Sequence, residues 1–128
     1  MSRNPAEWFS QAEYDLQSAQ TLFENRRYIH AVFMCHLSIE KALKGLYAFK
    51  LDELPPKTHN LIFIVEKVKI QMPESMYDFI STLTGVSVAT RYPDELKMMK
   101  NVYSKAKTKT LLEQGKEVLT WLRDQSKK

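Results

Sequence analysis

Residues that interrupt helices are scarce in this chain. Only 3 glycines and 5 prolines occur among its 128 residues, which leaves little material for tight turns and favours long helices. Apolar side chains recur at helical spacing through most of the sequence. These features predict an all-α fold, an up-and-down bundle of about five helices, built as one domain over residues 1–128.

The first half of the chain predicts two long helices. Asn4 followed by Pro5 suits an N-cap and a first helical position, which predicts a helix over residues 5–24. After a short polar break, a second helix is expected over residues 28–49. One face of this helix carries Tyr28, Val32, Cys35, Ile39, Leu43 and Leu46, and a different side carries Phe33 and Leu37. Two apolar faces indicate either the central helix of a bundle or a helix that also forms a subunit interface.

The second half is expected to be more broken. Pro55 and Pro56 mark a loop, and Thr58 is placed to cap a third helix that ends near residue 71. Pro73 starts a shorter helix, and Gly85 is expected to close it. Residues 85–107 are interpreted as a loop with room for one helical turn, and the last helix is expected over residues 108–125.

Several functional classes are excluded by the sequence. Its longest apolar run, residues 61–65, is far shorter than the roughly 20 residues of a membrane-spanning helix, and its first residues lack the pattern of a secretory signal. A single cysteine, Cys35, agrees with a reducing compartment, so a cytoplasmic location is expected. No glycine-rich phosphate loop, paired-cysteine motif or zinc spacing occurs, so neither a metal nor a cofactor is expected.

Positive charge is concentrated in the second half of the chain. The net charge is +4, and all of it comes from residues 61–128. Within residues 96–109 there is no acidic residue, and the stretch carries the lysines Lys97, Lys100, Lys105, Lys107 and Lys109. Such a segment would attract phosphates if it lay beside a cleft. A solvated lysine-rich loop without a ligand explains the same pattern.

Two groups of residues are candidates for chemistry. His36, Glu40 and Lys44 follow one another at single-turn spacing, which produces either an acid–base array or, more often, a stabilising surface stripe. His59, beside the expected cap, is interpreted as structural, with its ring bonded to loop carbonyls.

The second group is Arg91 and Tyr92, which Pro93 is expected to hold outside helical geometry. A guanidinium and a ring held outward would suit phosphate pairing and base stacking. The alternative is an arginine that caps a helix and a tyrosine that packs in the core.

Several sequence blocks together resemble the HEPN domain family (higher eukaryotes and prokaryotes nucleotide-binding). They cover residues 5–123 and include Trp8, Ala12 to Leu16, Ala19, Tyr28, Ala31, Phe33, His36, Ile39 to Lys44, Pro55, Thr58, His59, Leu61, Arg91 to Asp94, Glu117 and Trp121. The resemblance implies four main helices and a shorter one, as in nucleotidyltransferase substrate-binding subunits. It also implies a homodimer and a minimal nucleotidyltransferase as partner.

The sequence departs from the nuclease members of that family. Those members use an arginine followed, after four to six residues, by a histidine. No histidine follows Arg91, and Arg26 and Arg27 lie too close to His30 and too far from His36 to fit. The leading hypothesis is therefore a protein that binds nucleotide or RNA and is not an efficient nuclease.

Two alternatives remain open. One is a metal-independent RNA-cleaving toxin of a toxin–antitoxin pair, in which Arg91 meets His36 or His59 in space. The other is a non-catalytic protein-interaction module.

Overall fold

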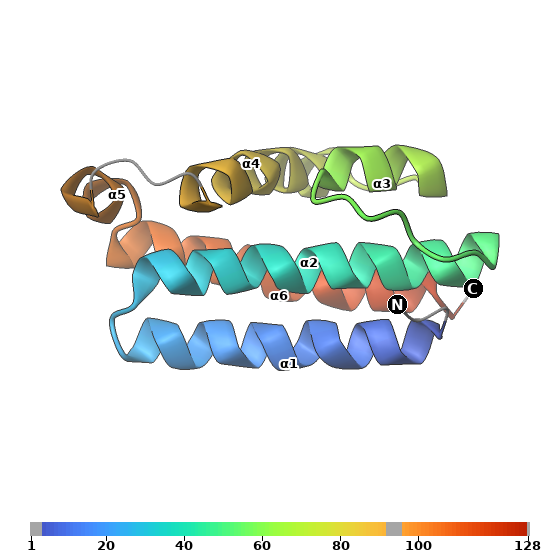
Figure 1. Cartoon of the computed structure of the whole chain (residues 1–128), viewed down its shortest axis with the longest axis horizontal. Coiled ribbons are helices and arrows are strands. Elements are labelled where there is room, and N and C mark those ends of the chain that lie inside the picture. Colours follow the sequence, from blue (N-terminus) through green and yellow to red (C-terminus); the bar gives the residue numbers. More distant parts are fainter. Residues whose placement is uncertain (1–3, 92–95, 128) are drawn as a thin grey trace.

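The computed structural model describes residues 4–91 and 96–127, and for residues 87–91 it describes the backbone alone. This part of the chain forms six helices and no strand: α1 (Pro5–Glu24), α2 (Tyr28–Leu51), α3 (Leu61–Val68), α4 (Glu74–Arg91), α5 (Leu96–Val102) and α6 (Lys105–Gln125). Figure 1 shows α1, α2 and α6 side by side along the long axis, with α3 and α4 in a second layer and α5 at one end. The predicted all-α bundle is confirmed.

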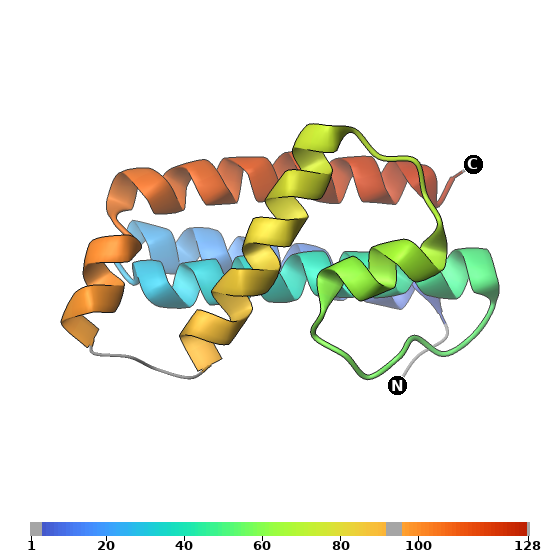
Figure 2. The ribbon, with the colours of Figure 1, turned by 90° about the horizontal axis from the view of Figure 1, so that it is seen from above.

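Helix α2 is the centre of the bundle. It contacts α1, α3, α4, α5 and α6, and Figure 2 shows α4 crossing obliquely above it. Its fully buried apolar residues are Ala31, Val32, Cys35, Ile39, Ala42, Leu43 and Leu46. Burying a side chain of the size of leucine or isoleucine stabilises the fold by about 1.5–3 kcal/mol. Packing within the chain thus explains the first apolar face of α2, as expected of a central helix, whereas Phe33 and Leu37 on the second face are only half-buried.

The start of α1 agrees with its prediction, and its end has an unusual feature. The Asn4 side chain accepts a hydrogen bond from the backbone N–H of Ala6 at 3.0 Å, and Pro5 is the first helical residue. Past Glu24, Arg26 adopts a left-handed backbone with φ of 62°. The backbone N–H of Arg27 donates to the carbonyl of Leu22 at 2.8 Å. Glycine usually occupies such a position, because a side chain there costs about 1 kcal/mol.

The cap and the end of the third helix differ from their predictions. Asn60, and not Thr58, is the N-cap, since its side chain accepts from the backbone N–H of Phe63 at 3.2 Å. The Thr58 hydroxyl accepts instead from the backbone N–H of Asn60 at 3.1 Å. Helix α3 ends at Val68, where Lys69 turns the chain with φ of 56°.

The loop predicted for residues 85–107 is wrong. Helix α4 continues through Gly85 to Arg91, α5 follows, and α6 begins at Lys105 with Ser104 as its N-cap. Along α4 the buried residues Phe79, Ile80, Leu83 and Val86 follow helical spacing. Their burial outweighs the roughly 1 kcal/mol by which glycine disfavours a helix interior. Within the described residues, no helix is long and apolar enough to cross a membrane.

Candidate functional site

Glu40 of α2 is the centre of a largely buried polar cluster. One carboxylate oxygen, Oε2, accepts from the Nζ of Lys44 at 3.2 Å, and the other, Oε1, lies 2.9 Å from the Nδ1 of His59. The side chains of Glu40 and Lys44 are each 7% exposed, whereas that of His59 is 56% exposed. Glu40 therefore ties the loop before α3 to the central helix.

The surface stripe expected for His36, Glu40 and Lys44 is wrong. All three side chains are buried, His36 completely, because α2 is packed against helices on several sides. The Nδ1 of His36 lies 4.0 Å from the Oε1 of Glu40. The Nζ of Lys44 lies 5.9 Å from the centre of the Trp8 ring on α1, within reach of a cation–π interaction. The Lys44 ammonium is therefore engaged inside the fold.

His59 and Glu40 form a dyad in which the carboxylate orients the imidazole. An ionised carboxylate only accepts hydrogen bonds, so Glu40 favours the tautomer in which the Nδ1 of His59 carries the proton. The lone pair then lies on Nε2, on a ring that is more than half exposed. This partner differs from the loop carbonyls expected for His59. The same arrangement of carboxylate and imidazole orients general bases in enzymes.

Arg91 is the last residue of α4, so its backbone is helical. The prediction that Pro93 holds Arg91 outside the helix is wrong, because a proline restricts most strongly the residue directly before it, which is Tyr92. The side chain of Arg91 and all of Tyr92 lie outside the described residues. Their roles in phosphate binding stay predictions.

A basic pocket lies where the turn between α1 and α2 meets α5 and the start of α6. It has a volume of about 470 Å³. The residues that line it are Arg26, Arg27, Tyr28, Ile29, His30, Leu96, Lys100, Tyr103, Ser104 and Lys105. None of these described residues is acidic. The five lysines predicted from the sequence are all exposed, and two of them, Lys100 and Lys105, belong to this pocket.

Arg26 and Arg27 are candidate site residues that sequence reasoning missed. The only local signal was two adjacent arginines in a short polar break, followed by an aromatic residue. Their link to Lys100 and Lys105 depends on the fold, which brings the turn after α1 beside α5. Burial raises the pKa of the Tyr103 hydroxyl, so this group stays a neutral hydrogen-bond donor in the pocket wall.

No metal centre is evident in the described part of the chain, where no three or more His, Cys, Asp or Glu side chains are placed to hold an ion. Cys35 is completely buried, and its Sγ lies 3.8 Å from the carbonyl oxygen of Leu111. Burial raises the pKa of its thiol to about 12. This cysteine is therefore a core residue and not a nucleophile.

Comparison with known proteins identifies the family. The HEPN domain model matches residues 5–125, so the chain belongs to the HEPN domain family. A search of curated proteins finds no match.

Two solved structures share the fold. The crystal structure of TT1696 from Thermus thermophilus has a TM-score of 0.82 and 20% sequence identity, covering 98% of this chain and 99% of that one. ST0689, an archaeal HEPN homologue, has a TM-score of 0.80 and 23% identity, with the same coverage of 98% and 99%.

Proposed function

We propose that this HEPN protein binds the phosphates of a nucleotide or of RNA at the end of the bundle that carries α5. The observation that supports the proposal is the convergence of positive charge from segments far apart in sequence. Arg26 and Arg27 from the first turn lie around one pocket with Lys100 and Lys105. In the part of the chain that the structure describes, none of these four side chains takes part in an ion pair. Arg91 is proposed as a further phosphate ligand.

The partner proposed for this protein is a minimal nucleotidyltransferase. That proposal comes from the family resemblance. A phosphate-binding pocket in this protein would supply the nucleotide or RNA on which such a partner acts, and this is the only support that the pocket gives. The test is to examine whether such a gene lies beside this one and to co-express the two proteins. Co-elution in gel filtration is expected, and separate elution at high concentration contradicts the partnership.

The binding proposal predicts a specific salt dependence. Reversing charge at Lys100→Glu and Lys105→Glu should weaken binding of labelled single-stranded RNA. The slope of log affinity against log salt concentration should also become less steep, by about 0.7 for each lost phosphate contact. Acidic residues suit the first turn of a helix, so α6 should remain folded. Fluorescence anisotropy over a range of salt measures both quantities.

The matched control reverses two lysines at the other end of the bundle. Lys50 lies in the last turn of α2 and Lys57 in the loop after it, and both are exposed. The double variant Lys50→Glu, Lys57→Glu has the same net charge as the test variant. If both variants lose RNA equally, binding is a response to net charge alone and the proposed location is wrong.

RNA cleavage is a second candidate function, and the His59–Glu40 dyad favours it. In such a reaction the Nε2 of His59 would take the proton of a ribose 2′-hydroxyl. The 2′-oxygen would bond to the adjacent phosphorus, and the 5′-oxygen would leave and be protonated by water or by the imidazolium. The test is incubation with RNA in excess chelator. Cleavage that disappears in His59→Ala supports this function, and intact RNA excludes it.

A further inference from the structure

We infer that the basic pocket is a site for one nucleotide that carries a terminal phosphomonoester, either as a free nucleoside monophosphate or as the phosphorylated end of an RNA strand. This inference rests on the proposed function and makes it more specific. It assigns the phosphate to Arg26, Arg27, Lys100 and Lys105, and the base to the apolar wall of Tyr28, Ile29 and Leu96.

The size of the pocket favours one nucleotide over a longer stretch of nucleic acid. Its volume of about 470 Å³ lies at the lower part of the roughly 300–1,000 Å³ typical of small-molecule sites. A duplex needs a groove or a stripe of charge along a surface and not a single hollow. The pocket therefore suits a strand end or a free nucleotide.

The charge of the pocket favours a phosphomonoester over a backbone diester. Two arginines and two lysines line it, and the described lining residues include no carboxylate. A diester carries one negative charge, whereas a monoester carries about 1.5 to 2 near neutral pH. The start of the 21-residue helix α6 also borders the pocket through Ser104 and Lys105, and a helix N-terminus favours anions.

The backbone at Arg26 makes glycine a suitable replacement in a test variant. Its φ of 62° lies in the left-handed region, where glycine would be more stable by about 1 kcal/mol. A guanidinium therefore stands in the pocket at a position where the fold itself favours glycine. Asp52 and Lys69, which lie outside the pocket, have the same left-handed backbone, so the side chain of Arg26 and not its φ carries the argument.

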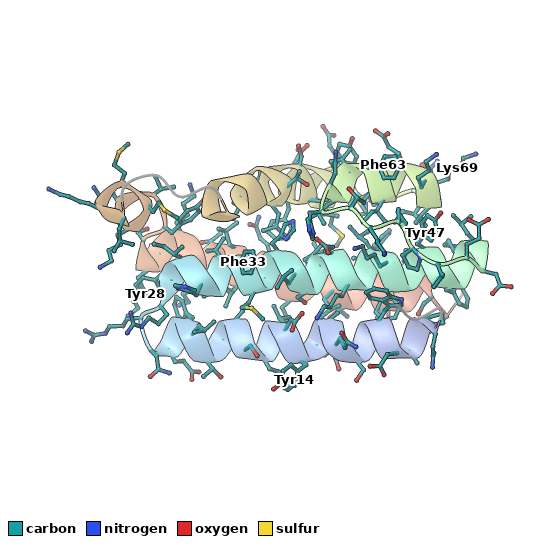
Figure 3. All side chains as sticks on the ribbon, in the orientation of Figure 1. Tyr14, Tyr28, Phe33, Tyr47, Phe63 and Lys69 are labelled. Carbon is teal, nitrogen blue, oxygen red and sulfur yellow. The ribbon has the colours of Figure 1, made fainter. Side chains whose placement is uncertain are left out.

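The apolar wall supplies a surface for a base. Figure 3 places Tyr28 at the end of the bundle where α1 turns into α2. Its ring is half-buried, and its centre lies 5.5 Å from that of Phe23, which fixes the ring in place. A fixed, partly exposed aromatic ring is a stacking surface that accepts any base. Selection among bases is thus expected to be weak, and selection for the phosphate strong.

The test compares two RNA oligomers of one sequence, labelled at the 3′ end, that differ only in a 5′-phosphate or a 5′-hydroxyl. The wild-type protein should bind the phosphorylated oligomer about tenfold or more tightly, the range of one or more charge-assisted hydrogen bonds. Adenosine monophosphate should compete with it, and adenosine should not. In the double variant Arg26→Gly, Arg27→Ala the preference for the phosphate should fall severalfold, because only Lys100 and Lys105 remain, and glycine at residue 26 keeps the turn folded.

The matched control is Lys97→Ala, Lys109→Ala, which removes the same charge from two exposed lysines outside the pocket. It should lower affinity for both oligomers and keep their ratio. RNA binding by the wild type without a preference for the phosphate overturns this inference and leaves the proposed function standing. Failure to bind either oligomer or the monophosphate overturns both. A preference that is undiminished in the arginine variant shows that the phosphate binds elsewhere, which also overturns the inference.

Discussion

Glu40 connects three segments of the chain through one carboxylate. It bonds Lys44 on its own helix and His59 in the loop before α3, and Lys44 in turn lies over the Trp8 ring of α1. Buried charges are tolerated when each has a partner, and removing one partner leaves the other uncompensated. The cluster therefore stabilises one arrangement of the loop even if it takes no part in chemistry.

This dependence predicts a large loss of stability in Glu40→Ala. The free energy of unfolding should fall by about 3–5 kcal/mol, because Lys44 would remain buried without its carboxylate. The exposed pair of Glu13 and Arg123 provides the control, and Glu13→Ala should cost no more than about 1 kcal/mol. Urea denaturation of both variants measures the difference. Equal losses would mean that burial does not strengthen the Glu40 cluster.

The Cys35 thiol predicts how stability changes at alkaline pH. Burial raises its pKa from 9.0 to about 12, so above pH 9 the unfolded chain loses the proton while the folded chain keeps it. The thiol's contribution to stability is complete below pH 9. It then falls by about 1.4 kcal/mol for each pH unit until about pH 12.

The measurement compares wild type with Cys35→Ala, since every other titrating group is shared. The difference between their free energies of unfolding should be about 2 kcal/mol smaller at about pH 10.5 than at about pH 8. A constant difference over this range would show that the thiol ionises in the folded protein. Thiol reagents should react with the native protein only as fast as it opens.

Among the elements, α1, α2 and most of α6 could be predicted from the sequence, and the region between Gly85 and Ser104 could not. Asn4, Pro5 and the polar break before Tyr28 are local signals, and local signals decide these boundaries. In α4, by contrast, Gly85 is a helix breaker and the valines after it alternate like a strand. Packing on α2 decides this segment, and no window of sequence contains that information.

Two helical glycines predict opposite effects of an added methyl group. A Cβ at Gly115 of α6 would lie 2.6 Å from the Sγ of Cys35 on α2, whereas a Cβ at Gly85 of α4 would meet nothing within 4 Å. Gly115→Ala should therefore destabilise the protein by about 1–3 kcal/mol through overpacking. Gly85→Ala should stabilise it by about 0.5–1 kcal/mol through helix propensity.

Thermal denaturation of the two variants tests this pair of predictions. A double variant, Gly115→Ala with Cys35→Ala, should recover part of the loss, because the sulfur that the methyl group meets is gone. If Gly115→Ala is as stable as Gly85→Ala, then α2 and α6 are not in close contact at this point.

At the scale of the molecule, the sequence predicts only part of the candidate site. The five lysines after Leu96 stood out because no acid interrupts them. Arg26 and Arg27 did not stand out, because their proposed role depends on Lys100 and Lys105, which are close in the fold and distant in the sequence. The reverse happened with His36 and Lys44, which matched a surface stripe by spacing and are buried by the bundle.

The assembly expected from the family resemblance is a homodimer. Packing within the chain buries one apolar face of α2, whereas Phe33 and Leu37 of the other face stay partly exposed. Light scattering should return twice the chain mass of 15.0 kDa. The exposed apolar residues of α5 include Leu96 and Met98, and Met98→Lys tests whether they lie in the contact. A mass of one chain at high concentration contradicts the dimer.

The positions of the helix ends set the mechanical behaviour of the molecule. Figure 1 shows the start of α1 and the end of α6 at the same end of the bundle, opposite to α5. A force applied through these two points would separate α1 and α6 from that end, one contact after another, and would not shear them along their length. Low forces should therefore open the protein. The basic pocket lies at the opposite end, about 35 Å away, and should be the last region whose helices separate.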